Sequence, residues 1–130
     1  MTLVADASAL LAILLDEADA DYYKAVLLAA RTVWISPVNW WEVLVRVRGE
    51  LGEEIEAETE LWRVKQRFVV EPITLEHAKL AAAAFARYRG RPARLNLGDC
   101  FAYALAQDKG VGLLYKGNDF TQTDVDRHSI

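Results

Sequence analysis

The chain is poor in the residues that mark special protein classes. Its 130 residues include one cysteine, three prolines and seven glycines. The single cysteine, Cys100, can form neither an intramolecular disulfide nor a cysteine zinc cluster, and we expect it to pack as a small apolar residue. So little glycine and proline, in a chain that is 53% hydrophobic and 26% charged, excludes collagen-like, low-complexity and disordered proteins. We therefore expect one folded domain spanning residues 1–130.

Long apolar segments and basic charge are also scarce. The longest apolar run, residues 9–15, is far shorter than the roughly 20 residues of a membrane span. No Lys or Arg precedes this run, so the N-terminus is unlike a secretory signal, and we expect a soluble cytoplasmic protein. Lys and Arg number 15 against 19 Asp and Glu, which gives a net charge of −4. A role in binding nucleic acid therefore needs a local basic patch or a bound cation.

Short apolar runs alternate with helical segments along the whole chain. Strands are predicted at 2–6, 32–35, 68–73 and 111–115. Helices are predicted at 8–15, 19–31, 38–51, 53–67, 74–89 and 98–109, with Ser8 and Ser36 as candidate N-caps. Because strands and helices alternate, the pattern predicts an α/β fold with a mostly parallel sheet of four or five strands.

Four carboxylates fall where such a fold places its sites, near the carboxyl ends of strands. Asp6 ends the first predicted strand, and Asp119 follows the last one after a short turn. Asp99 lies in the first turn of the 98–109 helix. Glu42 shares a helix face, which we expect to be buried, with Val38, Trp41 and Val45. Clustered carboxylate oxygens with open positions bind Mg²⁺ or Mn²⁺, and such ions bind phosphates.

Each acid also has a purely structural explanation. Asp6 can simply terminate a strand, and Asp99 can favour a helix N-terminus through the helix dipole. Glu42 can reach solvent from a half-buried face, and Asp119 can be a plain turn residue. The spacing of the acids leaves both explanations open.

Four stretches of the chain, in order and spacing, resemble the motif blocks of the PIN domain, and more closely those of VapC-type toxin ribonucleases. The stretches are VADASAL, VNWWEVL, LNLGDCFAYALA and LLYKGNDFTQTDV. The resemblance implies a three-layer α/β/α sandwich in which four acids hold Mg²⁺ or Mn²⁺: Asp6, Glu42, Asp99 and Asp119. It also implies supporting hydroxyls at Ser8 and Thr121. The C-terminal tail DVDRHSI departs from the pattern, so the last strand is left open.

The resemblance implies a metal-dependent endoribonuclease that is silenced by a cognate VapB-like antitoxin and forms a homodimer. Asp6 and Asp99 are then the expected direct ligands, with Glu42 and Asp119 completing the site. The alternative is a PIN-like module that binds RNA or a partner without cleaving it. A signalling receiver domain fits worse, because the first strand is followed by Asp6-Ala7-Ser8 rather than an acidic pair.

A cluster of arginines precedes Asp99 in the segment RYRGRPAR. Its members are Arg87, Arg89, Arg91 and Arg94. The cluster is either a solvated helix end and loop, or the positive surface that grips RNA phosphates beside the metal. The four tryptophans are expected in the core or an interface rather than as base-stacking platforms.

Overall fold

Four short parallel strands form the centre of the protein. The computed structural model describes residues 1–127, and its strands are β1 (Thr2–Ala5), β2 (Thr32–Ile35), β3 (Val69–Val70) and β4 (Gly112–Leu114). The order across the sheet is β3-β2-β1-β4, and every pairing is parallel. In this register Val4 of β1 lies between Trp34 of β2 and Leu113 of β4. The predicted parallel α/β fold is confirmed.

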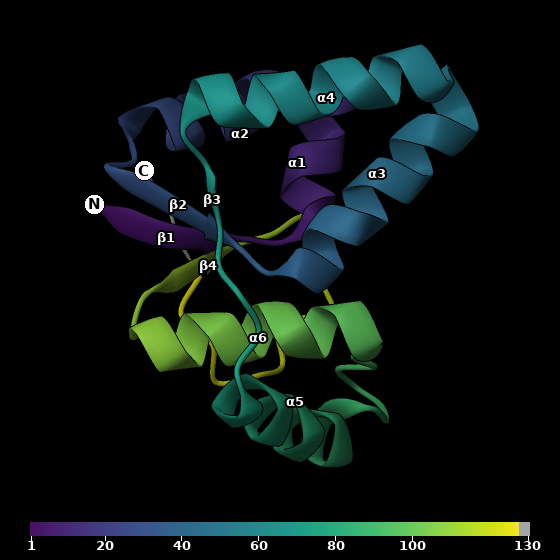
Figure 1. Ribbon diagram of the computed structural model, residues 1–130. Coiled ribbons are helices and arrows are strands. Elements are labelled where there is room, and N and C mark those ends of the chain that lie inside the picture. The colour runs from purple at the N-terminus through teal and green to yellow at the C-terminus, as the bar shows by residue number, and fades with distance from the viewer. Residues whose placement is uncertain (128–130) are drawn as a thin grey trace.

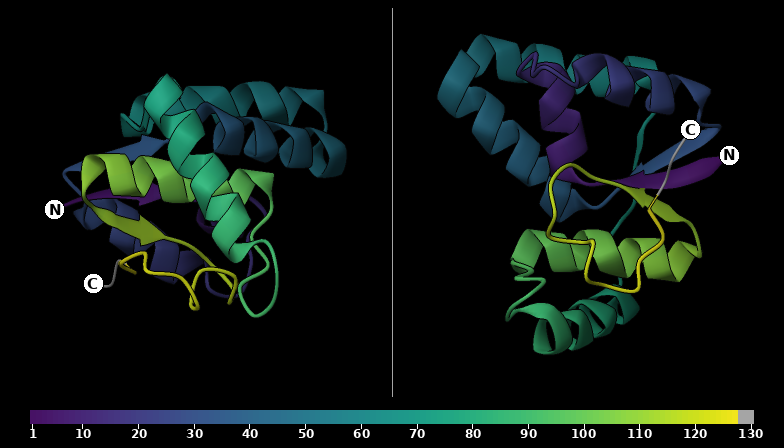
Figure 2. Two further views of the ribbon diagram at one scale, coloured as in Figure 1. Left: turned by 90° about the horizontal axis from the view of Figure 1, so that it is seen from below. Right: turned by 180° about the vertical axis from the view of Figure 1, so that it is seen from behind.

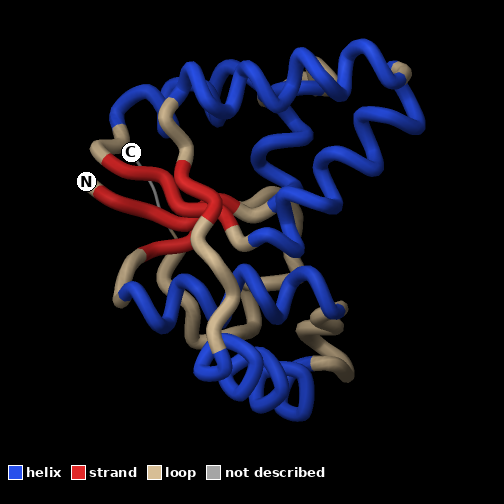
Figure 3. Tube along the Cα trace, viewed as in Figure 1, coloured by secondary structure: helices blue, strands red, loops and turns tan. Residues whose placement is uncertain are grey.

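Helices cover both faces of this sheet. They are α1 (Ala7–Leu14), α2 (Ala20–Ala29), α3 (Pro37–Leu51), α4 (Glu53–Gln66), α5 (Leu75–Tyr88) and α6 (Leu97–Lys109). Helices α1 to α4 lie on one side, with α3 and α4 forming a hairpin, and α5 and α6 lie on the other (Figures 1 and 2). Figure 3 shows the strands between these two helical layers, which is the three-layer sandwich that the resemblance to PIN domains implies. Within residues 1–127, no helix has the length and apolarity needed to cross a bilayer.

Alternation along β1 connects the two cores. Leu3 and Ala5 pack against α1, α2 and α3, whereas Val4 packs against α5 and α6. All three side chains are fully buried. Because each face of the sheet is covered, the three buried residues of β1, at 3–5, are all apolar, as expected for a central parallel strand. Burying an aliphatic side chain of this size contributes roughly 1.5–3 kcal/mol, so β1 is a rigid base for the residue that follows it.

The predicted helix boundaries agree with the structure to within two residues, but one cap differs. Ser36 caps α3 as predicted, its Oγ accepting from the Val38 N–H at 3.3 Å. Ser8 does not cap α1, because it is already helical. Asp6, with extended backbone, is the N-cap, and its carboxylate accepts from the Ser8 N–H. The first acid therefore has a helix-capping role as well as its place at the end of β1.

The third strand is much shorter than predicted. Only Val69 and Val70 of the predicted 68–73 strand pair with β2. The Glu71 N–H adds one further bond, to the Ile35 carbonyl at 3.0 Å, and Pro72 then has no N–H to donate. At the other edge, Arg127 forms an isolated parallel bridge with Leu113 of β4. The tail left open above therefore runs beside β4 as far as it is described, and residues 128–130 lie outside the described part.

Candidate functional site

Asp6 is held in place by hydrogen bonds of its backbone N–H and of its carboxylate. Its N–H donates to the Leu114 carbonyl at the end of β4 (2.9 Å), and its side chain is only 5% exposed. The Asp6 carboxylate accepts from the Ser8 hydroxyl at 2.6 Å, and that hydroxyl accepts from the Lys116 N–H at 2.9 Å. Ser8, the predicted supporting hydroxyl, thus ties the Asp6 carboxylate to the chain that leaves β4.

Asp99 is held by a reciprocal cap at the start of α6. Asn96 caps the helix by accepting from the Asp99 N–H (2.9 Å), and the Asp99 carboxylate accepts from the Asn96 N–H (3.0 Å). The side chain is 8% exposed. Among the described residues only one carboxylate oxygen, Oδ2, takes part in this cap, so Oδ1 is left for another ligand.

Glu42 lies at a close approach between α3 and α6. Its Oε1 accepts from the Asn39 amide at 2.9 Å, and the same amide donates to the Gly98 carbonyl at 2.9 Å. The Glu42 carboxylate rests against the Cα of Gly98. A Cβ at that position would lie 2.1 Å from Glu42 Oε1. Only glycine at residue 98 leaves room for the carboxylate in this place.

The predicted burial of the Glu42 face is wrong. Trp41 is 64% exposed and Val45 is 48% exposed. The buried side of α3 instead carries Asn39, Trp40, Val43 and Val47. Helical spacing shows which residues share a face, but the elements packed against the helix decide which face is buried. On α3 the buried face is the one next to the face that carries Glu42. Glu42 is therefore half-buried at the edge of an open hollow.

This hollow gathers three of the four predicted acids. It measures about 360 Å³, and we call it the carboxylate hollow; its lining is Asp6, Ala7, Ser8, Leu11, Trp41, Glu42, Val45, Arg46 and Asp99. Arg46 at its rim was not predicted, although its position four residues after Glu42 puts it on the same helix face. It pairs with the exposed Glu50 at 2.9 Å.

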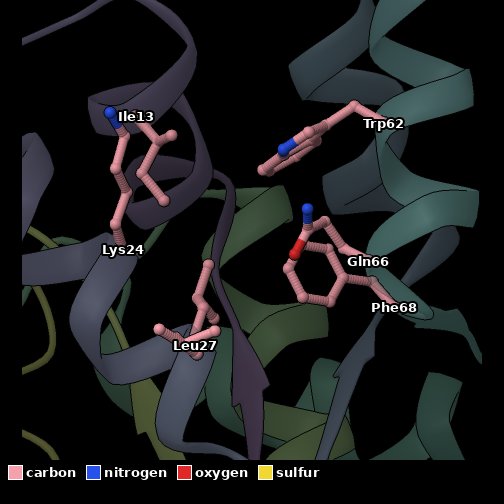
Figure 4. A pocket seen from close by; sticks show the side chains of 7 residues that line it. Ile13, Lys24, Leu27, Trp62, Gln66 and Phe68 are labelled. Atoms are coloured by element: carbon pink, nitrogen blue, oxygen red, sulfur yellow. The ribbon is translucent and has the colours of Figure 1, made fainter.

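A second hollow, of about 230 Å³, is not the candidate site. It lies between α1, α2 and α4, where apolar side chains such as Ile13, Leu27 and Phe68 face Trp62 (Figure 4). Lys24 and Gln66 are its polar members. With no carboxylate in its lining, this hollow offers no ligand set for a divalent cation.

Asp119 and Thr121 lie on the exposed turn after β4. The charge of Asp119 acts on Asp99 and raises its pKa, although Asp119 does not line the carboxylate hollow. Thr121 donates to the Asn118 carbonyl at 2.7 Å, within its own turn. The loop is anchored further on, where the Tyr103 hydroxyl donates to Asp124. Asp119 therefore acts on Asp99 through its charge, and Thr121 forms no side-chain hydrogen bond with the four acids among the described residues.

Burial controls the electrostatics of the carboxylate hollow. Desolvation raises the pKa of Asp6 from 3.8 to about 6, with a smaller contribution from the charge of Glu42. Desolvation, together with the charges of Asp6 and Asp119, raises the pKa of Asp99 to about 7. Burial and the charge of Asp99 also raise the pKa of Glu42. Each effect penalises the ionised form, so the metal-free site resists holding its full negative charge.

The same acids lack a matching positive charge. Within residues 1–127, no Lys, Arg or His forms an ion pair with Asp6, Glu42 or Asp99. Buried carboxylates are usually paired or bound to a metal. In this part of the chain no three Asp, Glu, His or Cys side chains already converge on a single metal position. Their oxygens are nevertheless the donors that hard divalent cations prefer, and this donor set fits Mg²⁺ or Mn²⁺.

The predicted arginine cluster divides into two pairs. Arg87 lies 3.7 Å from Asp124 and stacks over Tyr88, and Arg89 lies over the Phe85 ring. Arg91 and Arg94 are exposed on the loop between α5 and α6, and neither forms an ion pair among the described residues. This loop leads directly into the α6 terminus that carries Asp99.

Comparison with known proteins identifies a family for this chain. Residues 3–126 match the PIN domain family. VapC ribonuclease Mb0625 of Mycobacterium bovis is 42% identical over 139 aligned residues, which cover 96% of each chain. VapC20 of Mycobacterium tuberculosis, described as a sarcin-ricin loop cleaving toxin, has a solved structure that superposes with a TM-score of 0.80 at 17% identity, covering 95% of each chain. A toxin–antitoxin complex from Klebsiella pneumoniae contains a chain with a TM-score of 0.73 at 21% identity, covering 94% of this chain and 92% of that one. The chain therefore belongs to the PIN domain family and, within it, to the VapC ribonucleases.

Proposed function

We propose that this protein is a VapC-type toxin that cleaves RNA phosphodiester bonds with the help of Mg²⁺ or Mn²⁺. Its place among the VapC ribonucleases supports the reaction and the substrate class. The observation that carries the metal requirement is the group of acids in the carboxylate hollow, Asp6 and Asp99 buried and Glu42 half-buried, none of them paired with a cationic side chain in the described part. A divalent cation supplies the missing charge.

The four acids have different proposed roles in holding the metal. Asp6 and Asp99, the two most buried, are the proposed direct ligands, and Ser8 orients the Asp6 carboxylate through its hydroxyl. Glu42 and Asp119 complete the site from α3 and from the turn after β4. When bound, the divalent cation neutralises the scissile phosphate and lowers the pKa of the attacking water.

We propose that a cognate VapB-like antitoxin silences this activity in the cytoplasm, where the RNA substrate is present. The fold match to a chain of a toxin–antitoxin complex is in line with this partner. The predicted homodimer stays a prediction. Exposed apolar side chains beside the carboxylate hollow, among them Trp41 and Leu97, are compatible with burial against a second copy.

Replacing Asp99 with Asn tests catalysis against the alternative of a non-catalytic binding module. Asn keeps an oxygen that can accept from the Asn96 N–H, so the helix cap survives while the charge is lost. We expect cleavage of RNA by wild type with Mg²⁺ or Mn²⁺, none in EDTA, and a loss of about 100-fold or more in the variant. Gel assays of a labelled RNA measure the rate.

The control for this experiment is Glu76→Gln, which removes an exposed acid from the first turn of α5. It should cleave at the wild-type rate. A wild type that binds RNA but never cleaves it with either metal would support the binding module. An Asp99→Asn variant with full metal-dependent activity would remove Asp99 from the site.

Arg91 and Arg94 are expected to contact RNA phosphates. Each phosphate contact releases condensed counterions, so replacing both with Gln should weaken binding equally for all sequences and flatten the salt dependence of log affinity by nearly one unit per lost contact. Arg31→Gln, at the opposite end of the sheet before β2, is the control and should leave the slope unchanged. Fluorescence anisotropy with a catalytically inactive background gives the slopes. An unchanged slope in the double variant would show that Arg91 and Arg94 do not contact RNA and that the loop is simply a solvated surface.

A further inference from the structure

Asn39 is a fully buried polar residue that touches three parts of the candidate site. It lies one helical turn before Glu42 on α3 and is 0% exposed. Its amide nitrogen donates to Glu42 Oε1 and to the Gly98 carbonyl, both at 2.9 Å, and lies 3.5 Å from Asp6 Oδ1. One neutral amide therefore links the end of β1, helix α3 and the start of α6.

The surroundings settle which way the Asn39 amide points. All three of these neighbours present oxygens, so a flipped amide would set oxygen against oxygen three times. The nitrogen must face them, and Asn39 Oδ1 is left buried without a hydrogen-bond partner among the described residues. Buried polar atoms without partners are rare in native proteins, and each one calls for an explanation. An apolar side chain would fill this position without leaving a buried polar atom unpaired, so packing alone does not explain Asn39.

We propose that Asn39 is a positioning residue that holds Asp6 and Glu42 at the separation a divalent cation requires, using the backbone of Gly98 as its fixed support. This inference rests on the function proposed above. A Lys or Arg in the same place would neutralise the two carboxylates and compete with the cation. An acidic residue would add a third like charge. A neutral donor instead keeps the carboxylates together and leaves their charge available to the metal.

The test replaces Asn39 with Ala, which removes both N–H donors. Substituting a residue that orients a metal ligand by hydrogen bonding typically lowers metal affinity or activity by 10- to 100-fold. We expect Mn²⁺ to bind the variant at least about 10-fold more weakly, measured by calorimetry on the full-length protein without RNA. In cleavage assays kcat should fall while KM for RNA stays constant, because Asn39 is buried and cannot touch the substrate.

The matched control is Thr59→Ala. Thr59 is also buried and polar, but its hydroxyl donates to the Ile55 carbonyl within α4, away from the carboxylate hollow. This variant can lose stability, yet it should bind Mn²⁺ as wild type does. A second test variant, Asn39→Ser, fills more of the space but is too short to reach Glu42 and Gly98 together, so it should lose affinity as Asn39→Ala does.

The outcomes separate this inference from the proposed function. If wild type binds Mn²⁺ and Asp6→Asn weakens that binding, the metal site stands. Wild-type affinity in either folded Asn39 variant then overturns the positioning role alone. Failure of both Asn39 variants to fold would assign Asn39 to the scaffold and overturn it as well. A wild type that binds no Mn²⁺ would instead defeat the proposed metal site itself.

Discussion

Asp6→Asn is expected to make the metal-free protein more stable at pH 8 while abolishing RNA cleavage. In the folded protein, burial raises the pKa of Asp6 from 3.8 to about 6. A difference of that size corresponds to about 3 kcal/mol of cost for ionising this carboxyl in the folded state. Asn keeps the size and the acceptor oxygen of Asp6 but removes the charge, so it relieves this cost and removes a metal ligand at the same time.

The pH dependence of stability gives a sharper form of the same result. The folded-state pKa of Asp6 lies above its unfolded value, so the stability it contributes is fully present below about pH 4 and is lost as the pH rises through 6. Asp99 acts in the same direction, up to about pH 7. Wild type in EDTA should therefore lose stability between pH 4 and pH 8, and Asp6→Asn should lose less. Urea unfolding at several pH values measures both curves.

Added metal should reverse the order of the two proteins. A ligand that binds only the folded state stabilises it by RT ln(1 + [L]/Kd), which is about 2.7 kcal/mol at 100 times Kd. Wild type should gain this from Mg²⁺, and Asp6→Asn should gain much less. The control Asp21→Asn, which changes an exposed acid in the first turn of α2, should behave as wild type throughout. A metal-free Asp6→Asn that is 1–3 kcal/mol less stable than wild type, with an unchanged response to Mg²⁺, would show that Asp6 only supports the fold.

Sequence alone predicts those features of the site that are determined by residues close by in the sequence. An apolar run that ends in Asp6 predicts a buried strand with a carboxylate at its carboxyl end, and the structure has both. Ser36-Pro37 predicts the start of α3, because the hydroxyl caps the helix and Pro suits its first position. Asp99 is predicted in the first turn of its helix for a similar local reason. Even here a local prediction can miss by two residues: Ser8 is predicted to cap α1, and the structure has Asp6 as the cap.

Contacts between distant segments could not be predicted in this way. The helical pattern of α3 groups Glu42 with Trp41 and Val45, but only the packing of α3 shows that the neighbouring sector is the buried one. Asn39 could have been singled out because it lies three residues before Glu42, on the same side of the helix. Nothing in the sequence indicates that its amide meets the Gly98 carbonyl, since residues 39 and 98 are brought together only by the fold.

Gly98→Ala is expected to give a folded protein that has lost most of its RNA cleavage. The added Cβ would lie 2.1 Å from Glu42 Oε1 and 2.5 Å from Glu42 Cδ, so the carboxylate has to leave its place. That carboxylate is the end of a flexible side chain on a half-open face, and it can rotate outward without unfolding α3. Residue 98 is helical, where Ala is favoured over Gly by up to about 1 kcal/mol, which offsets part of any strain.

The rate of Gly98→Ala should therefore fall to that of Glu42→Ala, about 100-fold or more below wild type. Because both changes remove the same carboxylate from the site, the double variant should be no slower than either single one. Gly49→Ala is the matched control: Gly49 is also helical, on α3, and a Cβ there meets nothing within 4 Å. It should keep full activity and gain stability, as measured by thermal melts beside the cleavage assay. Full activity in a folded Gly98→Ala variant would mean that Glu42 does not act from its position against α6, and the role assigned to that acid would have to be withdrawn.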